Sequence, residues 1–304
     1  MQLDLGIIIV NWNTRDYLQK CLETVFASEG DFTYKVVVVD NASSDGSVEM
    51  VREHFPQVCL IASEVNGGYP YGNNVGLRAL GFRDAGDVDD DAPRYALLLN
   101  PDTELPPDAL YRMVKLMDER PEVGIAGPKL VLEDGSLDKA CRRGFPTPAV
   151  SFYHFAGLAK LFPKNERFGR YNMTFADPDE EIEVDSVVGA YMQVRRECIE
   201  AVGLLDETFF MYGEDLDWAY RIKAAGWKVL YHPQVVVRHV KRAASRKSKK
   251  AQFEFWRAML IFYRKHFRKT TPLWMHVLIL LALLAKGGPR MMQEIRHPTV
   301  SLAR

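Results

Sequence analysis

Four short apolar runs in the first third of the chain constrain the fold more than any other feature. They cover residues 5–10, 34–39, 58–62 and 97–99, and segments with apolar residues at helical spacing lie between them. A run that is apolar at nearly every position suits a strand buried on both faces, as in a parallel sheet. Strands that alternate with helices predict an α/β fold, in which helices flank a mostly parallel, doubly wound sheet.

Polar residues follow three of these runs directly. Asn11 and Asn13 follow the first run, Asp40 the second, and Asn100 and Asp102 the fourth. Ligands of open α/β sheets bind beyond the carboxyl ends of the strands. The proline before Asp102 prevents that strand from continuing as a central one, so Asp102 is expected where a buried strand opens onto a crevice. The sequence therefore predicts a binding site along this edge of the sheet.

Length and composition set the broad class. The chain has 304 residues, 47% hydrophobic and 26% charged, so it can bury a full core and is not disordered. Its four cysteines lie far apart without a Cys-x-x-Cys pair, which predicts no disulfide framework or cysteine metal cluster and favours a reducing cytoplasm. Residues 3–10 contain Asp4 and run straight into a strand pattern, so no secretory signal is expected.

The pattern loosens after Asp102. Residues 107–119 predict a helix and residues 124–132 a strand or two. Residues 135–183 have no clear period and are expected to form a long excursion that shapes a binding site. The remaining predicted elements are a strand at 186–195, a helix at 215–225, short strands at 228–231 and 235–238, and helices from 251 onward.

Four motifs occur in order along the chain. They are Ile-Ile-Ile-Val-Asn-Trp-Asn at 7–13, Val-Asp-Asn-Ala-Ser-Ser-Asp-Gly-Ser at 39–47, Asn-Pro-Asp at 100–102 and Gly-Glu-Asp-Leu-Asp at 213–217. This set, spread over residues 3–239, closely resembles family 2 glycosyltransferases, and among them the bacterial rhamnosyltransferase-like members that build cell-surface polysaccharides. The resemblance implies a GT-A fold, a nucleotide-diphosphate sugar donor, a divalent metal (Mg²⁺ or Mn²⁺) and inversion at the anomeric carbon.

The resemblance also implies a division of the chain. Residues 1–240 would form the GT-A domain, with the donor half at about 1–105 and the acceptor half at about 106–240. Residues 241–304 would form a basic and apolar helical extension. The subgroup suggests deoxythymidine-diphosphate rhamnose as donor, with a uridine-diphosphate sugar as the alternative. Processive members carry Gln-x-x-Arg-Trp after the base, and this chain has Tyr-Arg-Ile-Lys at 220–223, so transfer of one sugar is expected.

Asp102 is the expected metal ligand. A hard cation takes oxygen ligands, often one or two carboxylates completed by substrate phosphates. Several Asp-x-Asp strings occur in the chain, but only the one at 100–102 ends a buried strand, with Asn100 in place of the first carboxylate. The alternative role of Asp102 is to cap the helix near residue 107. His239 is a candidate second ligand, because similar enzymes place a histidine there, and a purely structural histidine is the alternative.

Several residues are expected around the donor. The family's counterpart of Asp40 contacts the nucleotide, and Asn11 and Asn13 would line the same pocket; an Asx turn is the alternative role for Asp40. Residues 66–74 resemble the family's glycine-rich stretch beside the donor sugar, so Gly68 and Asn73 are assigned donor contacts. Tyr-Pro-Tyr at 69–71 departs from the small residues expected there, which leaves the donor open.

Glu214 and Asp215 are the candidate catalytic residues. They begin a predicted helix, whose dipole favours ionised carboxylates. The resemblance places the catalytic base at Asp215, with Glu214 as support or acceptor contact. Gly189 and Trp218 are assigned to the acceptor site. Asp217 is expected to form a structural pair with Arg221 four residues later, and a strand bulge is the alternative role for Gly189.

The C-terminal third predicts a surface role. Residues 238–250 carry seven Lys or Arg and no acid, and they could close over the diphosphate or form a solvated run. Residues 273–285 are uncharged but too few to span a bilayer readily. With basic and aromatic neighbours, this segment favours peripheral docking on the inner face of the plasma membrane, beside a glycan or polyprenyl-diphosphate-linked acceptor. A homodimer interface is the alternative, and no nucleic-acid module is present.

Two other functions were weighed against an inverting, metal-dependent glycosyltransferase. A sugar nucleotidyltransferase shares the nucleotide-binding sheet, but its glycine-rich loop with Arg and Lys is missing after Val10. A non-catalytic nucleotide-sugar-binding protein at a membrane is the second alternative. The presence of both Asp102 and Asp215 argues against it.

Overall fold

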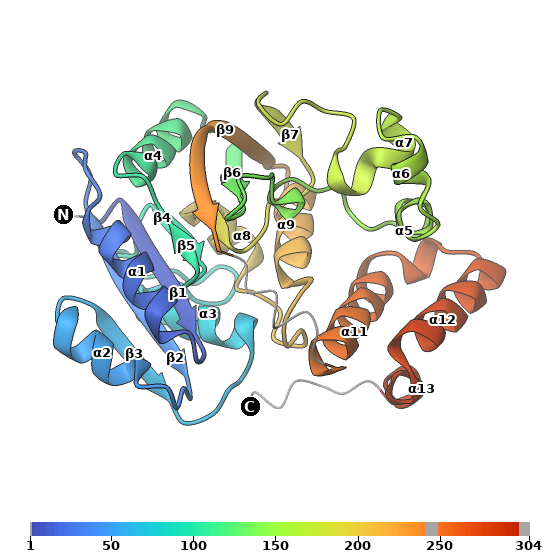
Figure 1. Ribbon diagram of the computed structural model, residues 1–304, viewed down its shortest axis with the longest axis horizontal. Coiled ribbons are helices and arrows are strands. Elements are labelled where there is room, and N and C mark those ends of the chain that lie inside the picture. Colours follow the sequence, from blue (N-terminus) through green and yellow to red (C-terminus); the bar gives the residue numbers. More distant parts are fainter. Residues whose placement is uncertain (1, 241–248, 298–304) are drawn as a thin grey trace.

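A computed structural model describes residues 2–240 and 249–297, and a single sheet runs through its centre (Figure 1). The first half of the chain supplies β1 (Leu5–Asn11), α1 (Arg15–Phe26), β2 (Tyr34–Asn41), α2 (Ser47–His54), β3 (Cys59–Ser63), α3 (Tyr69–Ala79), β4 (Tyr95–Leu99), β5 (Thr103–Glu104) and α4 (Ala109–Glu119). The second half supplies β6 (Val123–Val131), α5 (Pro148–Phe155), α6 (Leu158–Leu161), α7 (Glu166–Gly169), β7 (Ile182–Val184), β8 (Tyr191–Arg195), α8 (Arg196–Val202), α9 (Glu214–Ala224) and β9 (Lys228–His239). The C-terminal helices are α11 (Lys249–His266), α12 (Leu273–Gly287) and α13 (Pro289–Arg296).

The sheet order is β3-β2-β1-β4-β8-β6-β9-β5, with β7 paired to β9. Strands β1 to β4 are mutually parallel, which confirms the predicted doubly wound half. Strand β8 runs antiparallel to β4 and β6, so the second half is mixed. Every residue of β1 and β4 is buried, as their continuous apolar runs predict.

Helix α1 shows how an apolar stripe attaches to the sheet. Its buried residues are Leu18, Cys21, Leu22 and Val25, spaced three or four apart so that they share one face. Thr14 occupies the N-cap position, but its hydroxyl donates to Asn11 Oδ1 at 2.5 Å and does not cap the helix. The side chain therefore braces the end of β1.

Two regions differ from the sequence prediction. Residues 228–231 and 235–238 were predicted as separate strands, and the structure joins them in β9. The pairing with β6 skips residues 233–235, so Pro233 falls where a missing N–H removes no ladder hydrogen bond. Within residues 135–183, the structure forms the short helices α5 to α7. Side-chain caps begin two of them: Thr147 accepts from Val150 N at the start of α5, and Asn165 accepts from Arg167 N and Phe168 N at the start of α7.

A buried carboxylate joins the C-terminal helices to α9. Asp217 is fully buried, and its carboxylate lies 2.9 Å from Arg221 Nε, which confirms the predicted pair. It also lies 2.9 Å from Lys265 Nζ and 2.7 Å from His266 Nε2, both on α11. Burial alone would raise the pKa of Asp217, but the hydrogen bond from His266 and the charges of Arg221 and Lys265 lower it to about 2.

We expect Asp217→Ala to weaken the fold markedly, because it leaves the Arg221 and Lys265 charges without their buried partner. Breaking such a pair costs about 3 kcal/mol when the partners keep some solvent contact. Since the pKa is lowered from 3.8 to about 2, this stabilisation is present above about pH 4 and is lost as the pH falls toward 2. Urea unfolding at pH 7 and pH 3 measures it. Asp87→Ala, in an exposed loop, is the control, and equal midpoints for the two variants would refute the expectation.

Candidate active site

The polar residues that end the parallel strands lie together, as the sequence predicts. Strand register places Asn11 beside Asp40 across β1 and β2, and Ile9 beside Leu99 across β1 and β4. Asn100, the residue after β4, donates its N–H to the Ala190 carbonyl at 3.0 Å. The carboxyl ends of β1, β2 and β4 therefore form one edge, and the loop before β8 reaches it.

Asp102 and His239 come together through a short pairing of strands. Strand β5 begins just after Asp102 and runs antiparallel to the end of β9, with Thr103 opposite His239. His239 Nε2 lies 3.3 Å from Asp102 Oδ1. Asp102 is partly exposed, with 15% of its side chain accessible, whereas His239 is buried. The candidate metal position thus consists of a partly exposed carboxylate beside a buried imidazole.

The spacing of these two atoms suits a shared cation. Ligand atoms about 2.1 Å from an octahedral ion lie about 3 Å apart when they are neighbours, close to the Asp102–His239 separation. Among the described residues, no group of three or more His, Cys, Asp or Glu could form a complete metal cage. A cation here would therefore need ligands from a substrate as well, as Mg²⁺ commonly does in phosphate-handling sites.

A second carboxylate lies behind His239. Asp138 Oδ2 is 2.9 Å from His239 Nδ1, and Asp138 is itself buried. Burial alone would lower the pKa of His239, but hydrogen bonds to Asp102 and Asp138 raise it to about 9. Asp138 was not predicted, because it lies in the aperiodic region, far from His239 in sequence.

The Asp40 region is a preformed hydrogen-bonded loop. Asp40 Oδ1 accepts from Asn11 Nδ2 at 2.7 Å, and Oδ2 accepts from Ser43 N at 2.8 Å. The side chain thus holds the loop, although it bonds the N–H three residues on and not the one two residues on of an Asx turn. Asn13, at φ +52°, accepts from Ser44 N through its side chain. Asn11 has no exposed surface, so direct donor contact by Asn11 is corrected to support of this loop. The exposed group at the end of β1 is Trp12, 54% accessible, which the sequence analysis did not single out.

The glycine-rich stretch packs against the loop before α9. Gly68 has φ +93°, and a Cβ there would lie 2.3 Å from the Phe210 carbonyl oxygen, which accepts from Tyr69 N at 2.8 Å. The glycine is therefore required for this loop contact. Asn73 is fully buried and donates to the Tyr69 carbonyl at 2.9 Å. The predicted donor contact of Asn73 is wrong in this conformation, because its side chain reaches no surface.

Glu214 and Asp215 begin α9 and have different surroundings. Asp215 Oδ2 accepts from Arg143 Nη2 at 2.5 Å and from Gly189 N at 3.1 Å. Burial alone would lower the pKa of Arg143, but the Asp215 charge raises it. Glu214 Oε2 is buried and has no hydrogen-bond partner among the described residues. Burial, with repulsion from Asp215, raises the pKa of Glu214 to about 8, so it is largely protonated at neutral pH.

Tyr69 lies between the two halves of the site. Its hydroxyl donates to the Gly189 carbonyl at 2.7 Å. Burial raises its pKa well above the ordinary value, and the charges of Glu214, Asp215 and Asp102 contribute in the same direction. The three predicted carboxylates thus act on one phenol. The roles of Tyr69 and Arg143 are not predictable from any of the four motifs, and the unexpected Tyr-Pro-Tyr at 69–71 is the one indication in the sequence.

The acceptor assignment of Trp218 needs correction. Trp218 is fully buried, and its indole N–H donates to the Gly203 carbonyl at 2.9 Å. It belongs to the core beneath α9 and cannot contact an acceptor in this conformation. Gly189 remains at the site, where its two backbone groups hold Tyr69 and Asp215.

Most of the predicted basic segment at 238–250, namely residues 241–248, lies outside the described residues. Lys250, the last residue of the segment, is described and lies with Nζ 4.4 Å from the centre of the Phe210 ring.

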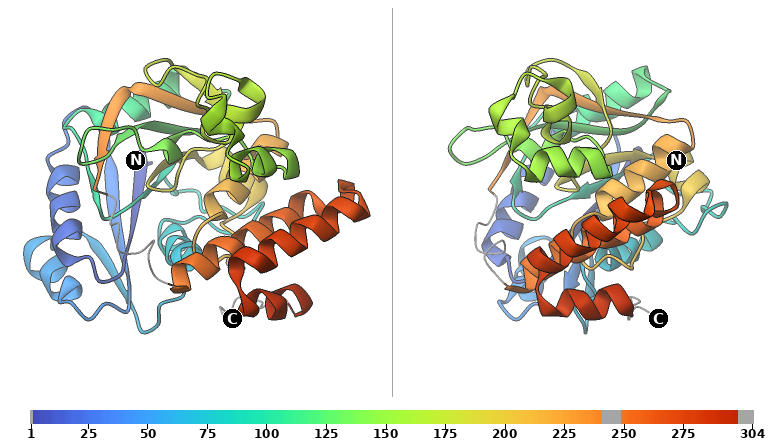
Figure 2. Two further views of the ribbon diagram at one scale, coloured as in Figure 1. Left: turned by 45° about the vertical axis from the view of Figure 1, so that its right-hand side comes forward. Right: turned by 90° about the vertical axis from the view of Figure 1, so that its right-hand side faces the viewer.

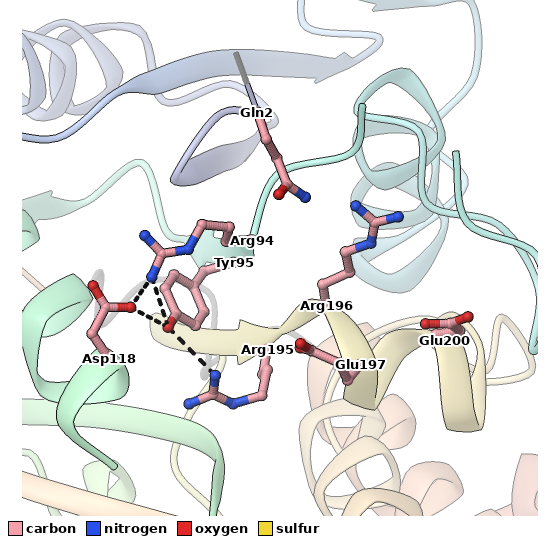
Figure 3. Close-up of a pocket in the computed structure, with 8 residues that line it drawn as sticks. All are labelled: Gln2, Arg94, Tyr95, Asp118, Arg195, Arg196, Glu197 and Glu200. Carbon is pink, nitrogen blue, oxygen red and sulfur yellow. Dashed lines mark hydrogen bonds and ion pairs between the residues drawn. The ribbon is translucent and has the colours of Figure 1, made fainter. Parts of the chain in front are cut away.

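A separate cavity of about 510 Å³ lies at the opposite edge of the sheet, where β4 begins (Figure 3). There Tyr95 donates to Asp118 at 2.6 Å, and Arg94 binds Asp4 and Asp118. Arg195 donates to the carbonyls of Val123 and Met117. Because these cations are already paired within the protein, this cavity is structural and distinct from the carboxylate site.

Comparisons with known proteins agree with this geometry. Residues 3–254 match the family described as "Glycosyltransferase like family 2". The chain is 30% identical over 242 residues to an N-acetylglucosaminyl-diphospho-decaprenol L-rhamnosyltransferase of Mycobacterium tuberculosis, covering 78% of this chain and 76% of that protein. It is also 30% identical to the rhamnosyltransferase WbbL of Escherichia coli, covering 75% and 80% of the two chains.

Two solved structures share the fold. A mannosyltransferase of Pyrobaculum calidifontis in complex with GDP-Man and Mn²⁺ superposes with a TM-score of 0.56 at 17% identity, over 97% of this chain and 79% of that chain. GalNAc-T7 with UDP, GalNAc and Mn²⁺ superposes with a TM-score of 0.59 at 16% identity, over 97% and 57%. The family match, the relatives and the sheet together show that this chain belongs to glycosyltransferase family 2 and is a sugar-transferring enzyme with the GT-A fold.

Proposed function

We propose that this enzyme transfers one sugar, rhamnose, from a nucleotide-diphosphate donor to a polyprenyl-diphosphate-linked glycan in cell-surface polysaccharide synthesis, with inversion. The observation that carries the proposal is the pairing of Asp102 with His239 at the carboxyl edge of the sheet, together with Asp215 held at the start of α9 by Arg143 and the Gly189 N–H. The names of two relatives support the sugar, and one of those names contains a diphospho-decaprenol acceptor. A uridine-diphosphate sugar is the alternative donor.

On this proposal, the donor lies along the carboxyl ends of β1, β2 and β4. The exposed Trp12 indole would stack on the nucleotide base, and the Asp40 loop would fix the position of Trp12 and Asn13. Asp102 and His239 would hold a Mg²⁺ or Mn²⁺ ion, which when bound neutralises the leaving diphosphate. The Mn²⁺ in two structures of the same fold supports this assignment.

Inversion requires the acceptor hydroxyl to lose a proton as it attacks from the face opposite the diphosphate. We assign the base to Asp215, whose carboxylate is held in place by Arg143 and the Gly189 N–H. Protonated Glu214 would donate a hydrogen bond to an acceptor oxygen. Asp215 would take the hydroxyl proton, and the new glycosidic bond would form as the bond to the diphosphate breaks.

Binding of nucleotides tests the donor site. We expect one nucleoside diphosphate, thymidine or uridine, to raise the melting temperature of the wild type in the presence of Mn²⁺, because a ligand of the native state stabilises it by mass action. Asp102→Ala should abolish the metal-dependent part of the shift. The control is Asp108→Ala, because Asp108 is an exposed aspartate that lies shortly after Asp102 in the sequence. No shift with any nucleotide would overturn the donor site.

Kinetics of two conservative variants test the division of roles on α9. Asp215→Asn should lower kcat by about 10²- to 10⁴-fold, the usual contribution of a general base, with unchanged nucleotide binding. Glu214→Gln keeps a hydrogen-bond donor and should retain kcat within about tenfold. The reverse ranking would assign the base to Glu214.

The pH dependence of stability gives an independent check on Glu214. Its pKa is raised from 4.5 to about 8, so the folded chain keeps a proton there that the unfolded chain releases. The contribution of this group to the free energy of unfolding therefore falls as the pH rises from about 4.5 to 8. Glu214→Gln has no such titrating group. Its melting temperature minus that of the wild type should therefore increase from pH 5 to pH 8.5. A constant difference across that range would contradict a buried, protonated Glu214.

We also propose that two helical segments dock the enzyme on the cytoplasmic face of the plasma membrane. Helix α12 exposes an apolar stripe consisting of Leu273, Trp274, Val277, Leu278 and Leu281. Helices α5 and α6 expose Phe152, Phe155, Leu161 and Phe162. The Phe155 ring lies 5.1 Å from that of Trp256 on α11, and both segments face the viewer in the right-hand panel of Figure 2.

The charges beside these segments favour an anionic lipid surface. Residues 255–293 carry seven Lys or Arg and no acid, and residues 147–165 carry two Lys and no acid. Within the described parts of the chain, no helix is both long and apolar enough to cross a membrane. These features support peripheral association, with the apolar side chains in the interface and the cations at the headgroups.

Flotation with vesicles tests the docking. Full-length enzyme should float with phosphatidylglycerol-containing vesicles at low salt, and the double variant Trp274→Ser, Leu278→Ser should lose most of this binding. Val65→Ser is the control, because Val65 is 61% exposed on a different part of the surface. If the wild type does not bind vesicles, and light scattering shows that the wild type is a dimer and the double variant a monomer, the face is a homodimer interface instead.

A further inference from the structure

We propose that Asp138 is the positioning residue of the metal site. By accepting the N–H of His239 Nδ1, it would fix the imidazole with Nε2 directed at Asp102, where a divalent cation would take the place of the Nε2 proton. This inference rests on the proposed metal role of Asp102 and His239. It adds a residue that lies outside every motif of the sequence and does not itself touch the ion.

The geometry places the imidazole of His239 between two carboxylates. Asp138 Oδ2 is 2.9 Å from His239 Nδ1 on one side of the ring, and Asp102 Oδ1 is 3.3 Å from Nε2 on the other. Asp138 and His239 are 3% and 4% exposed, whereas Asp102 reaches solvent. The buried carboxylate therefore serves to orient the ring, and the partly exposed one faces the place where substrate phosphates would arrive.

The backbone holds Asp138 firmly. Its N–H donates to the Leu130 carbonyl at 2.9 Å, and its other carboxylate oxygen, Oδ1, accepts from Ala140 N at 3.2 Å. One oxygen thus caps the short helical turn Lys139–Cys141, while the second is directed at the histidine. Asp138 belongs to a hairpin anchored on β6, and β6 pairs with β9 as far as Val131 opposite Arg238. The backbone therefore fixes Asp138 beside the ring of His239.

The chemistry explains why such a carboxylate matters. An imidazole binds a metal through the nitrogen that carries no proton, so a partner that retains the proton on Nδ1 leaves the Nε2 lone pair available. Carboxylates behind ligating histidines also raise the basicity of the ligand, and their loss typically weakens metal binding about 10- to 100-fold. A carboxylate that only filled a buried space would have no such effect on affinity.

Metal affinity of the folded protein tests the inference. Mn²⁺ binding is measured by electron paramagnetic resonance, with saturating nucleoside diphosphate, on wild type, Asp102→Ala, Asp138→Ala and Asp138→Asn. We expect Asp138→Ala to raise the Mn²⁺ dissociation constant about 10- to 100-fold, and Asp138→Asn, which can still accept from Nδ1, to give a smaller increase. Asp134→Ala, in the exposed turn of the same hairpin, should bind like wild type.

A second measurement does not depend on affinity. With ¹⁵N-labelled histidine and Mg²⁺, nuclear magnetic resonance should show the His239 proton on Nδ1 in wild type, and a mixture of the two ring tautomers in Asp138→Ala. If Asp138→Ala binds Mn²⁺ like wild type while Asp102→Ala does not, Asp138 has no positioning role and the metal site stands. If the wild type fails to bind Mn²⁺, both the metal site and this inference fall.

Discussion

The antiparallel pairing of β5 with β9 is the contact on which the site depends. Two residue pairs, Thr103 with His239 and Glu104 with Arg238, attach the end of the parallel half to the last strand of the mixed half. An ion pair of 3.0 Å between Arg238 and Glu104 reinforces them. Without this pairing, Asp102 would end a strand on one side of the sheet and His239 a strand on the other. Their juxtaposition is therefore a property of the whole topology, although each residue belongs to a local motif.

A second set of contacts connects helix α9 to the surface of the molecule. Helix α9 begins with Glu214 and Asp215 and contains Asp217, which binds Lys265 and His266 of α11. Helix α11 in turn packs against α12, with Leu260 and Leu283 in a common apolar cluster. The face proposed to meet the membrane is thus linked to the proposed base through two helices. The orientation of the enzyme on a bilayer would determine where its acceptor hydroxyl approaches.

The parts predicted from sequence are those that local chemistry defines. Apolar runs and the polar residues after them located the parallel strands and the binding edge, and four motifs located the carboxylates. The contributions of Asp138, Arg143 and Tyr69 were not predicted, because each residue contacts a partner far away in sequence. Neither apolar periodicity nor a local motif indicates such a pairing. Asn73 and Trp218 were misplaced for the opposite reason. Each adjoins a motif, but its side chain points into the core, a direction that residue type alone does not reveal.

The close approach at Gly68 limits which substitutions the loops around it can accept. The carbonyl of Phe210 occupies the space that any side chain at position 68 would need, so the glycine-rich stretch at 66–74 and the loop that leads into α9 fit together as one surface. A substitution that reshapes one of them displaces the other. If these two segments contact the donor and the acceptor as proposed, preference for the sugar and preference for its recipient would be mechanically coupled, and a variant selected for a new donor would have to preserve this contact or evolve a new acceptor loop with it.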